Sequence, residues 1–434
     1  MVKNFSPKIA LVAGEPSGDL LASRIIEGIQ QHSAGATFTG IGGPHMRDAG
    51  MDIQFPMDTL SVFGYVDALK SLPKLIHTYK SLEKNLLAHR PDVFVGVDAP
   101  DFNLRLEHKL RGEGIPTVHF VGPSIWAWRY ERIYKIREAV SHMLVLFPFE
   151  TAIYDKVGIP VTFVGHPTAS QIPLVPDREK ARQELGLPAD ARIVAILPGS
   201  RASEIKLLAE PFLKAAQFLA AKDTSIHFIV PVVNQARAEQ FKEIAQHIPV
   251  PNLHIYGNYE YTQASSDNLT GVQEANRNSG KNEGHSTTNG HAHFIEHQLK
   301  RTSSRPISWL VMEACDAAIA ASGTATLELA LFKRPMVIAY KLTPLMKMLM
   351  AWKSGQDKPY LPWVGLPNIL LNDFVVPELL QEDCTPTKLV EATWNALDNT
   401  TYIAKVKRQF HDLHLSLKQD TAGLAAQVIL EMCK

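Results

Sequence analysis

The sequence predicts an α/β protein made of two successive Rossmann-like halves, each a doubly wound parallel sheet. Short runs rich in Val, Ile and Ala alternate with longer helical patterns, as in KIALVAG at 8–14 followed by 19–32. This alternation is typical of βαβ units. A proline-rich stretch at 164–182 interrupts it, and a second series starts with ARIVAIL at 191–197. Because such stretches join domains, we expect one α/β domain on either side of it.

We expect domains at 1–167 and 168–400, and a helical segment at 401–434 that packs back on the N-terminal domain. Residues 261–306 break the pattern, since Ser, Thr, Asn, Gly and Gln dominate there. Such a composition cannot bury enough apolar surface to offset its ordering entropy, so a disordered insertion is predicted. The insertion contains four histidines without a tight metal-ligand spacing: His285, His291, His293 and His297.

The composition excludes several classes of protein. The chain has 434 residues, 45% of them hydrophobic, and its 44 basic residues balance 44 acidic ones. This balance disfavours a general nucleic-acid binder. Three cysteines without C-x-x-C spacing cannot build a disulfide framework or a zinc ribbon, and they favour a reducing cytoplasm. No stretch approaches the ~18 apolar residues that span a bilayer, and the N-terminal apolar run is too short for a signal peptide.

The sequence lacks the two common nucleotide-phosphate fingerprints. A dinucleotide site requires G-x-G-x-x-G in the first strand–helix turn, but that turn reads AGEPSGD at 13–19. GIGG at 40–43 comes closer, with His45 in the place of the third glycine. The G-K-[ST] of a P-loop is absent. An NAD-dependent oxidoreductase is therefore disfavoured.

The turn ILPGSRASEI at 196–205 is a candidate diphosphate site. A buried strand ends there, Gly199 frees the backbone, and a helix opens around Ser203 and Glu204. Free N–H groups at a helix start, with Arg201 beside them, form a cradle for a diphosphate. The alternative is a Pro-Gly turn with an N-cap serine and a solvated arginine.

The turn SGT at 322–324 repeats this arrangement before an apolar helix. Glu328 is the one charge among small and apolar neighbours, and a capping box with Thr324 would require Glu at 327, where Leu stands. A carboxylate at Glu328 could accept both hydroxyls of a ribose. The alternative is a solvent-facing helix glutamate.

Two aspartates follow the buried strand in PDVFVGVDAPDFN at 91–103. Ligands of open α/β sheets bind beyond the carboxyl ends of the strands. Asp101 is suited to cap the next helix. Asp98, directly at the strand end, is the better candidate for a general base, because a carboxylate in a partly dry site can remove a proton from a hydroxyl. A plain turn role for Asp98 is the alternative.

Together these motifs resemble the lipid-A-disaccharide synthase family of GT-B glycosyltransferases. The motifs run in order from residue 11 to 371: LVAGEPSGD, FVGVDAPDFN, PSIWAWR, LFPFETAIYDKVGIPVTFVGHP, ILPGSRASEI, PVVN, ASGTATLE and LPNILL. The resemblance implies a GT-B fold, with two Rossmann-like domains facing a cleft. It also implies an inverting hexosyltransferase of lipid A (lipopolysaccharide) biosynthesis. Such an enzyme joins UDP-2,3-diacylglucosamine to 2,3-diacylglucosamine 1-phosphate (lipid X), giving a β-1,6-linked disaccharide 1-phosphate and UDP.

The resemblance also implies roles for individual residues. Asp98 would deprotonate the 6-hydroxyl of the acceptor, and inversion by one displacement requires a single carboxylate. UDP would be held by six residues: Gly199, Ser200, Arg201, Gly323, Thr324 and Glu328. The acceptor and its sugar would contact four residues: Glu15, Ser17, Asp19 and Asn368. No D-x-D motif is present, so neither a metal nor another cofactor is expected.

Both substrates of this family carry acyl chains, so the resemblance implies a peripheral protein on the cytoplasmic face of the inner membrane. Amphipathic stretches at 65–87 and 342–353 could contact that surface or pack on their own sheets. Trp126 and Trp128 are expected to pack, with an acyl contact as the alternative. A homodimer is also considered. The alternative functions are a UDP-sugar epimerase and a non-catalytic nucleotide-binding protein of similar fold.

Overall fold

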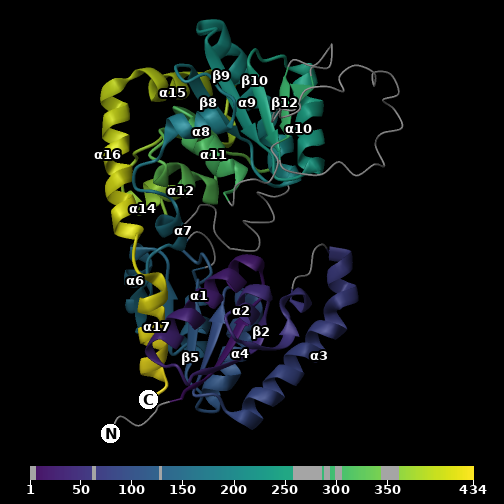
Figure 1. Ribbon diagram of the computed structural model, residues 1–434, viewed down its shortest axis with the longest axis vertical. Helices are drawn as coiled ribbons and strands as arrows, with labels where there is room; N and C mark the ends of the chain where they lie inside the picture. Colours follow the sequence, from purple (N-terminus) through teal and green to yellow (C-terminus); the bar gives the residue numbers. More distant parts are fainter. Residues whose placement is uncertain are drawn as a thin grey trace, which may run out of the picture. The chain divides into compact units, whose positions relative to one another are not determined.

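The computed structural model describes residues 6–60, 65–126, 130–257, 286–287, 294–298, 305–343 and 361–434, without the side chains of 65–72, 286–287 and 298. The chain divides into two compact units. The first contains the residues up to Gln171 together with Ser416–Lys434, and the second contains 172–343 and Pro362–Leu415. Each unit has a sheet of its own with helices around it (Figure 1).

The first unit contains a seven-stranded sheet in the order β3-β2-β1-β4-β5-β6-β7, with all pairings parallel. Its strands are β1 (Lys8–Ala13), β2 (Thr37–Gly42), β3 (Asp52–Pro56), β4 (Val93–Val97), β5 (Thr117–Phe120), β6 (His142–Val145) and β7 (Val161–Phe163). Its helices are α1 (Pro16–His32), α2 (Pro44–Asp48), α3 (Tyr65–His89), α4 (Pro100–Gly112), α5 (Arg132–Ala139), α6 (Pro148–Asp155) and α7 (Pro167–Gln171). The central strands are almost wholly buried, which explains their continuous apolar runs.

The second unit contains an eight-stranded sheet in the order β11-β12-β10-β9-β8-β13-β14-β15. Its strands are β8 (Arg192–Leu197), β9 (Ile226–Pro231), β10 (Leu253–Gly257), β11 (Ser286–Thr287), β12 (Ile295–Gln298), β13 (Ala317–Ala321), β14 (Met336–Tyr340) and β15 (Glu378–Leu380). Its helices are α8 (Arg178–Glu184), α9 (Ala202–Lys222), α10 (Gln235–His247), α11 (Ile307–Ala314), α12 (Thr324–Leu331), α14 (Leu366–Leu371) and α15 (Pro386–Asp398). Only the pair β11 and β12 is antiparallel among the described strands.

The strand β12 corrects the prediction of a disordered insertion over 261–306, which is wrong for Ile295–Gln298. This strand pairs in parallel with β10. Phe294 packs against the core of the second unit, and the ring of His297 lies 3.0 Å from a ring nitrogen of His254. These neighbours are distant in sequence, so local composition could not reveal them. Most of the stretch lies outside the described residues, including three of its histidines: His285, His291 and His293.

The C-terminal helical segment, expected at 401–434, forms two helices. The first is α16 (Thr400–Leu417), and most of it belongs to the second unit. The second is α17 (Thr421–Met432), which packs on α1 of the first unit (Figure 1). Gly28 of α1 permits this close approach, because a Cβ there would lie 2.9 Å from the carbonyl oxygen of Ala422.

The strand order determines where loops gather in each unit. In the first sheet, β1 lies between β2 and β4, so the loops that follow β1 and β4 diverge at a topological switch point. In the second sheet, β8 lies between β9 and β13, which makes the loops after β8 and β13 the equivalent pair. Ligands of open α/β sheets bind at such points. The predicted site motifs follow these four strands.

Beneath β4, the first unit buries a hydrogen-bonded glutamate–histidine pair between α4 and β5. Glu107 Oε1 lies 2.8 Å from Nδ1 of His119, and both side chains are fully buried. Burial raises the pKa of Glu107, and the neighbouring His119 opposes that rise. The pair needs the space that Gly96 leaves in β4, since a Cβ there would lie 2.2 Å from Glu107 Oε1 and 2.9 Å from Asn103 Cβ.

We therefore expect Gly96→Ala to lower the free energy of unfolding by about 2–4 kcal/mol, through overpacking and disruption of the buried pair. Urea denaturation would measure the change. Gly112→Ala is the matched control, because a Cβ at the end of α4 meets no atom within 4 Å. A loss of stability of the same size in both variants would contradict this account of Gly96.

Candidate functional site

The turn after β4 places Asp98 at the carboxyl end of the first sheet in a left-handed backbone conformation. Asp98 and Ala99 have φ values of 52° and 43°, in a region that costs a non-glycine residue about 1–3 kcal/mol. Asp98 N–H donates to the carbonyl of Phe120 at 2.8 Å, and Nδ2 of buried Asn103 donates to the Asp98 carbonyl at 2.7 Å. Two hydrogen bonds thus hold a strained turn, as is common at functional sites.

A cavity of about 1130 Å³ opens beside this turn. One part of its wall is apolar and includes Leu75, Ile76 and an edge-to-face pair, Tyr79 and Phe102, whose ring centroids are 5.5 Å apart. Four acidic residues line the cavity, Glu15, Glu83, Asp98 and Asp101, together with three basic ones, Lys80, Arg105 and Lys109. The cavity therefore combines an apolar wall with charged side chains of both signs, among them the candidate base.

Asp101 has a different role from the one expected. The helix α4 begins at Pro100 after Ala99, so Asp101 lies within the first turn and is not the N-cap. Its carboxylate pairs with Arg132 at 2.7 Å and is 92% exposed. Both aspartates line the cavity, but only Asp98 lies on the strained turn, while Asp101 is paired with Arg132.

Two predicted acceptor residues lie elsewhere. Asp19 is fully buried, and its carboxylate accepts hydrogen bonds from the backbone N–H groups of Gly43, His45 and Met46 at 2.8–3.1 Å. It caps the start of α2, so the expectation that it lines the acceptor side is wrong. Ser17 is exposed in the first turn of α1 and is not among the residues that line the cavity.

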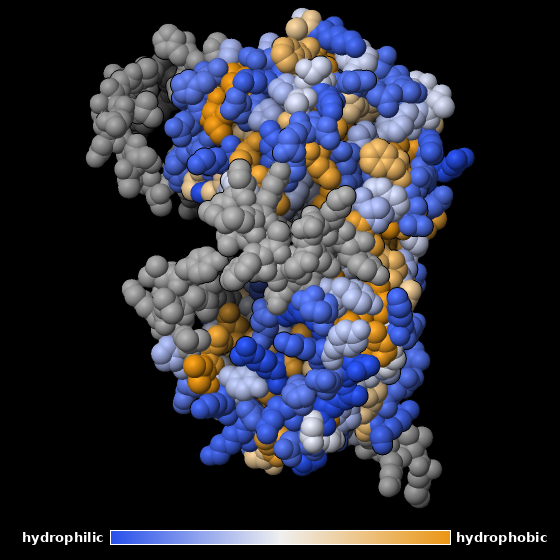
Figure 2. Space-filling model, turned by 180° about the vertical axis from the view of Figure 1, so that it is seen from behind, coloured by the Kyte–Doolittle hydropathy of each residue, from blue (hydrophilic) through white to orange (hydrophobic). Residues whose placement is uncertain are grey.

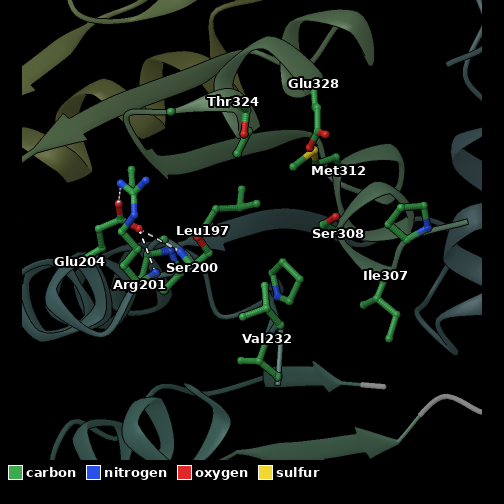
Figure 3. Close-up of a pocket in the computed structure, with 18 of the residues that line it drawn as sticks. Leu197, Ser200, Arg201, Glu204, Val232, Ile307, Ser308, Met312, Thr324 and Glu328 are labelled. Carbon is green, nitrogen blue, oxygen red and sulfur yellow. Dashed lines mark hydrogen bonds and ion pairs between the residues drawn. The ribbon is translucent and has the colours of Figure 1, made fainter. Parts of the chain in front are cut away.

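In the second unit, the loops after β8 and β13 border a cavity of about 960 Å³ (Figure 3). All six residues of the predicted nucleotide set line it: Gly199, Ser200, Arg201, Gly323, Thr324 and Glu328. A Cβ on Gly323 would meet no atom within 4 Å, so the space above that backbone is open. The cavity also has lining residues that no motif assigned, among them Val232 of PVVN, Arg305 and Ser308.

Glu204 occupies the donors that were predicted to be free at the start of α9. Its Oε2 accepts from the N–H groups of Ser200 and Arg201 at 3.0 and 3.1 Å, and Oε1 lies 3.1 Å from Nη1 of Arg201 (Figure 3). Gly199 is required here, because its φ is 109° and a Cβ would lie 2.3 Å from Glu204 Oε2. The helix begins at Ala202, so Ser203 is not its N-cap. The sequence contained a signal for this contact, because a glutamate at position N3 of a helix commonly accepts a hydrogen bond from the backbone at the helix start.

Glu328 lies on α12 and is partly buried, which excludes a fully solvent-facing role. Burial raises the pKa of Glu328, while a hydrogen bond from the Trp309 side chain opposes that rise. In Figure 3 its carboxyl group lies beside Met312 at the cavity wall. Thr324, the first residue of the same helix, is exposed.

Asn368 is fully buried in the second unit and faces neither cavity. Its Nδ2 donates to the carbonyl of Val376 and to Glu378 Oε1, both at 2.8 Å, and its Oδ1 accepts from the N–H groups of Val375 and Val376. The amide holds the connection between α14 and β15. The expectation that Asn368 contacts a sugar is therefore wrong.

Sequence reasoning missed a buried acid near the carboxyl edge of the first sheet. Glu150 accepts hydrogen bonds from Phe147 N–H at 3.1 Å and from the Trp126 side chain. Burial raises the pKa of Glu150 to about 7, against an ordinary value of 4.5. Trp126 is 8% exposed and its ring centroid is 5.4 Å from that of Phe149, which confirms its packing role. Trp128 lies outside the described residues.

The two stretches predicted to contact a membrane are described only in part. In α3, Ile76 is 46% exposed, but the side chains of 65–72 lie outside the description, as do residues 344–353. Figure 2 shows apolar side chains at the left of the first unit, the side on which α3 lies. No helix in the described part of the chain is long and apolar enough to cross a bilayer. No group of three potential metal ligands occurs among the described residues either.

Comparison with known proteins identifies close sequence relatives. A family model described as lipid-A-disaccharide synthetase matches residues 9–269 and 292–431. A lipid-A-disaccharide synthase of Bordetella pertussis is 55% identical over 428 residues, covering 99% of both chains. A lipid-A-disaccharide synthase of Aromatoleum aromaticum is 46% identical, covering 98% of this chain and 96% of its own.

Solved structures with the same fold are more distant in sequence. Anabaena HepE in complex with UDP-glucose has a TM-score of 0.52 and 13% identity, covering 98% of both chains. A putative UDP-N-acetylglucosamine 2-epimerase from Listeria monocytogenes has a TM-score of 0.56 and 10% identity, covering 98% of this chain and 95% of its own. At this identity the likeness concerns the fold alone. It is the fold of GT-B glycosyltransferases and related epimerases.

We expect the buried Glu150 to make stability depend on pH. The pKa of Glu150 is higher in the folded than in the unfolded chain, so folding favours the neutral carboxyl group. The free energy of unfolding therefore falls as the pH rises from about 4.5 to about 7. Glu150→Gln should therefore gain about 3 kcal/mol relative to the wild type between about pH 5 and pH 8. Urea denaturation at both pH values would measure this gain. The exposed Glu138→Gln serves as control, and an equal gain there would contradict the assignment.

Proposed function

The chain belongs to the lipid-A-disaccharide synthetase family and is a glycosyltransferase of lipid A disaccharide synthesis, and from this membership we propose its substrates and mechanism. The donor is UDP-2,3-diacylglucosamine and the acceptor is 2,3-diacylglucosamine 1-phosphate. The product is a β-1,6-linked disaccharide 1-phosphate, released with UDP. One displacement at the anomeric carbon inverts its configuration.

We assign UDP to the cavity of the second unit. The observation that carries this proposal is that six residues predicted from the sequence, in the two segments that follow β8 and β13, line one cavity at the switch point of the sheet. Backbone N–H groups at the starts of α9 and α12 and the Arg201 guanidinium suit a diphosphate. Partly buried Glu328 suits the ribose hydroxyls. These groups supply the charge stabilisation, and we propose that no metal ion is needed.

The carboxylate of Glu204 occupies donors that we assign to the diphosphate. It accepts from two backbone N–H groups and pairs with Arg201, which is 80% exposed. A diphosphate that binds the same donors has to displace at least part of these contacts. Binding of UDP is therefore an exchange of one anion for another at the start of α9.

We assign the acceptor to the first unit and the role of base to Asp98. The apolar wall of its cavity suits acyl chains, and the basic side chains Lys80, Arg105 and Lys109 suit the 1-phosphate. The Asp98 carboxylate takes the proton of the 6-hydroxyl as that oxygen bonds to the anomeric carbon. The bond between that carbon and the UDP oxygen breaks, and UDP leaves with the bonding electron pair.

The acylated substrates also support a location at the cytoplasmic face of the inner membrane. Exposed Ile76 on α3 lies beside the acceptor cavity and gives an acyl chain a path from the bilayer. A homodimer stays a prediction.

The proposed reaction is tested by incubating the protein with both acylated sugars and following UDP and the disaccharide by mass spectrometry. A UDP-sugar epimerase would change the donor alone and form no disaccharide. A non-catalytic nucleotide-binding protein would bind UDP without turnover.

We expect Asp98→Ala to lower kcat about 10²–10⁴-fold, because the base is lost. The Kd for UDP should stay within a few-fold of the wild type, since the second unit is unchanged. Asp101→Ala is the matched control, because Asp101 lines the same cavity but its exposed carboxylate pairs with Arg132, and it should retain activity within a few-fold. Survival of activity in Asp98→Ala would exclude Asp98 as the base.

We expect Glu204→Gln to bind UDP several-fold more tightly, because a neutral amide competes less for Arg201 and still caps the helix. Isothermal titration calorimetry would measure the Kd. The exposed Glu210→Gln on the same helix is the control and should leave the Kd unchanged. Weaker UDP binding in Glu204→Gln would refute the exchange of anions.

A further inference from the structure

A third cavity, of about 370 Å³, lies in the second unit at the opposite edge of the sheet from the proposed UDP site. Arg192 begins β8, Asp316 directly precedes β13, and Arg334 precedes β14 by two residues. These positions are at the amino ends of three adjacent strands, whereas the Gly199 and Gly323 loops follow the carboxyl ends. Strands of five or six residues separate the two edges by roughly 15–20 Å. The cavity is therefore distinct from the proposed UDP site.

Positive charge dominates this cavity. Five cationic side chains line it: Arg178, Arg182, Arg192, Arg334 and Lys407. Only Asp190 and Asp316 among the lining residues are acidic. Arg192 forms ion pairs with Asp223 and Asp398, which do not line the cavity. Without Arg192, four cationic side chains and two carboxylates remain in the wall of the cavity.

Asp316 is already fully engaged. Its Oδ1 pairs with Arg178 at 2.7 Å, while Oδ2 pairs with Arg182 at 2.8 Å and accepts from the N–H of Ile193 at 2.9 Å. Arg182 is only 2% exposed and also donates to two backbone carbonyls. Asp316 is thus shared between Arg178 and Arg182, and no carboxylate of the described residues contacts the two other cations of the cavity, Arg334 and Lys407.

Arg334 is a buried cation without a contacting carboxylate. It is 6% exposed and donates to the backbone carbonyls of Met312 and Glu313. No ion pair to Arg334 occurs within the described ranges. Burial lowers the pKa of Arg334, while the nearby charges of Asp316 and Glu313 oppose that shift. A buried cation that no carboxylate contacts directly is costly, and an anion in the cavity would reduce that cost.

Lys407 extends from α16 toward the same cavity. In the described part of the chain, it makes no hydrogen bond and no ion pair. Lys407 is exposed at the rim of the cavity; partial desolvation and the charges of Arg334 and Arg178 lower its pKa, and Asp316 opposes them. Three cations from α8, the α12–β14 turn and α16 therefore converge on one space; these helices are labelled in Figure 1.

We propose that this cavity binds a phosphate-bearing dianion, held by Arg178, Arg334 and Lys407. The excess of two positive charges matches the charge of a phosphate monoester. Guanidinium groups offer paired N–H donors that fit phosphate oxygens, and the lysine adds a mobile point charge. A volume of about 370 Å³ accommodates more than the phosphate group alone. The phosphate belongs either to a small soluble compound or to a lipid headgroup.

Titration calorimetry with inorganic phosphate tests the proposal at constant ionic strength, with chloride as the exchanged anion. One titration contains saturating UDP, which occupies the proposed UDP site at the carboxyl edge of the sheet. A second titration uses the Arg201→Ala variant without UDP, so that the result does not depend on where UDP binds. We expect one phosphate site in each titration. The double variant Arg178→Gln/Lys407→Gln should weaken it at least tenfold. Lys405→Gln, an exposed lysine on the same helix, is the control and should leave it unchanged.

Sedimentation with vesicles distinguishes the two sources of phosphate. Loss of binding to vesicles that contain phosphatidic acid, a lipid with a phosphomonoester headgroup, in the double variant, with the control unaffected, assigns the site to a lipid headgroup. Unchanged vesicle binding together with weakened phosphate binding assigns it to a soluble phosphate compound. Wild-type protein that binds no phosphate, or a double variant that binds it as tightly as the wild type, overturns the proposal.

Discussion

The parallel pairing of strands is the constraint on which both candidate sites depend. All strands of the first sheet point the same way, so the carboxyl ends of β1 and β4 meet at one edge, where the strand order reverses. In the second sheet the same reversal brings together the loops after β8 and β13. Residues more than 120 positions apart, such as Arg201 and Glu328, thereby line one cavity.

Buried polar groups hold the loops of these sites in place. Asn103 uses its amide to fix the carbonyl of Asp98, and the pair of Glu107 and His119 fills the space under Gly96. In the second unit, Asn368 ties α14 to β15. Breaking these buried hydrogen bonds is costly, so they favour one loop conformation, although Asn103 Oδ1, Glu107 Oε2 and His119 Nε2 have no hydrogen-bond partner among the described residues. The chemistry at the surface of the loops rests on these interior contacts.

A carboxylate lies at each edge of the sheet of the second unit, Glu204 at the carboxyl edge and Asp316 at the amino edge. At the carboxyl edge, Glu204 satisfies N–H groups that a nucleotide diphosphate would otherwise take. At the amino edge, Asp316 neutralises only part of a cluster of arginines. At the carboxyl edge a carboxylate of the chain occupies the donors, whereas at the amino edge no carboxylate of the described residues contacts Arg334. Both arrangements underlie the proposals of phosphate-bearing ligands at the two edges.

The sequence by itself determined the two α/β halves, the turn at Asp98 and the two loops around Gly199 and Gly323, because local periodicity and turn chemistry are written within short segments. Only the tertiary structure decided which side chains are buried and which groups they contact. Asp19 caps a helix formed more than 20 residues later, and Asn368 is enclosed by β15. Ile295–Gln298 becomes a strand because β10 is beside it. The cationic cavity likewise exists only because four separate segments meet at one edge, a proximity that no local pattern encodes.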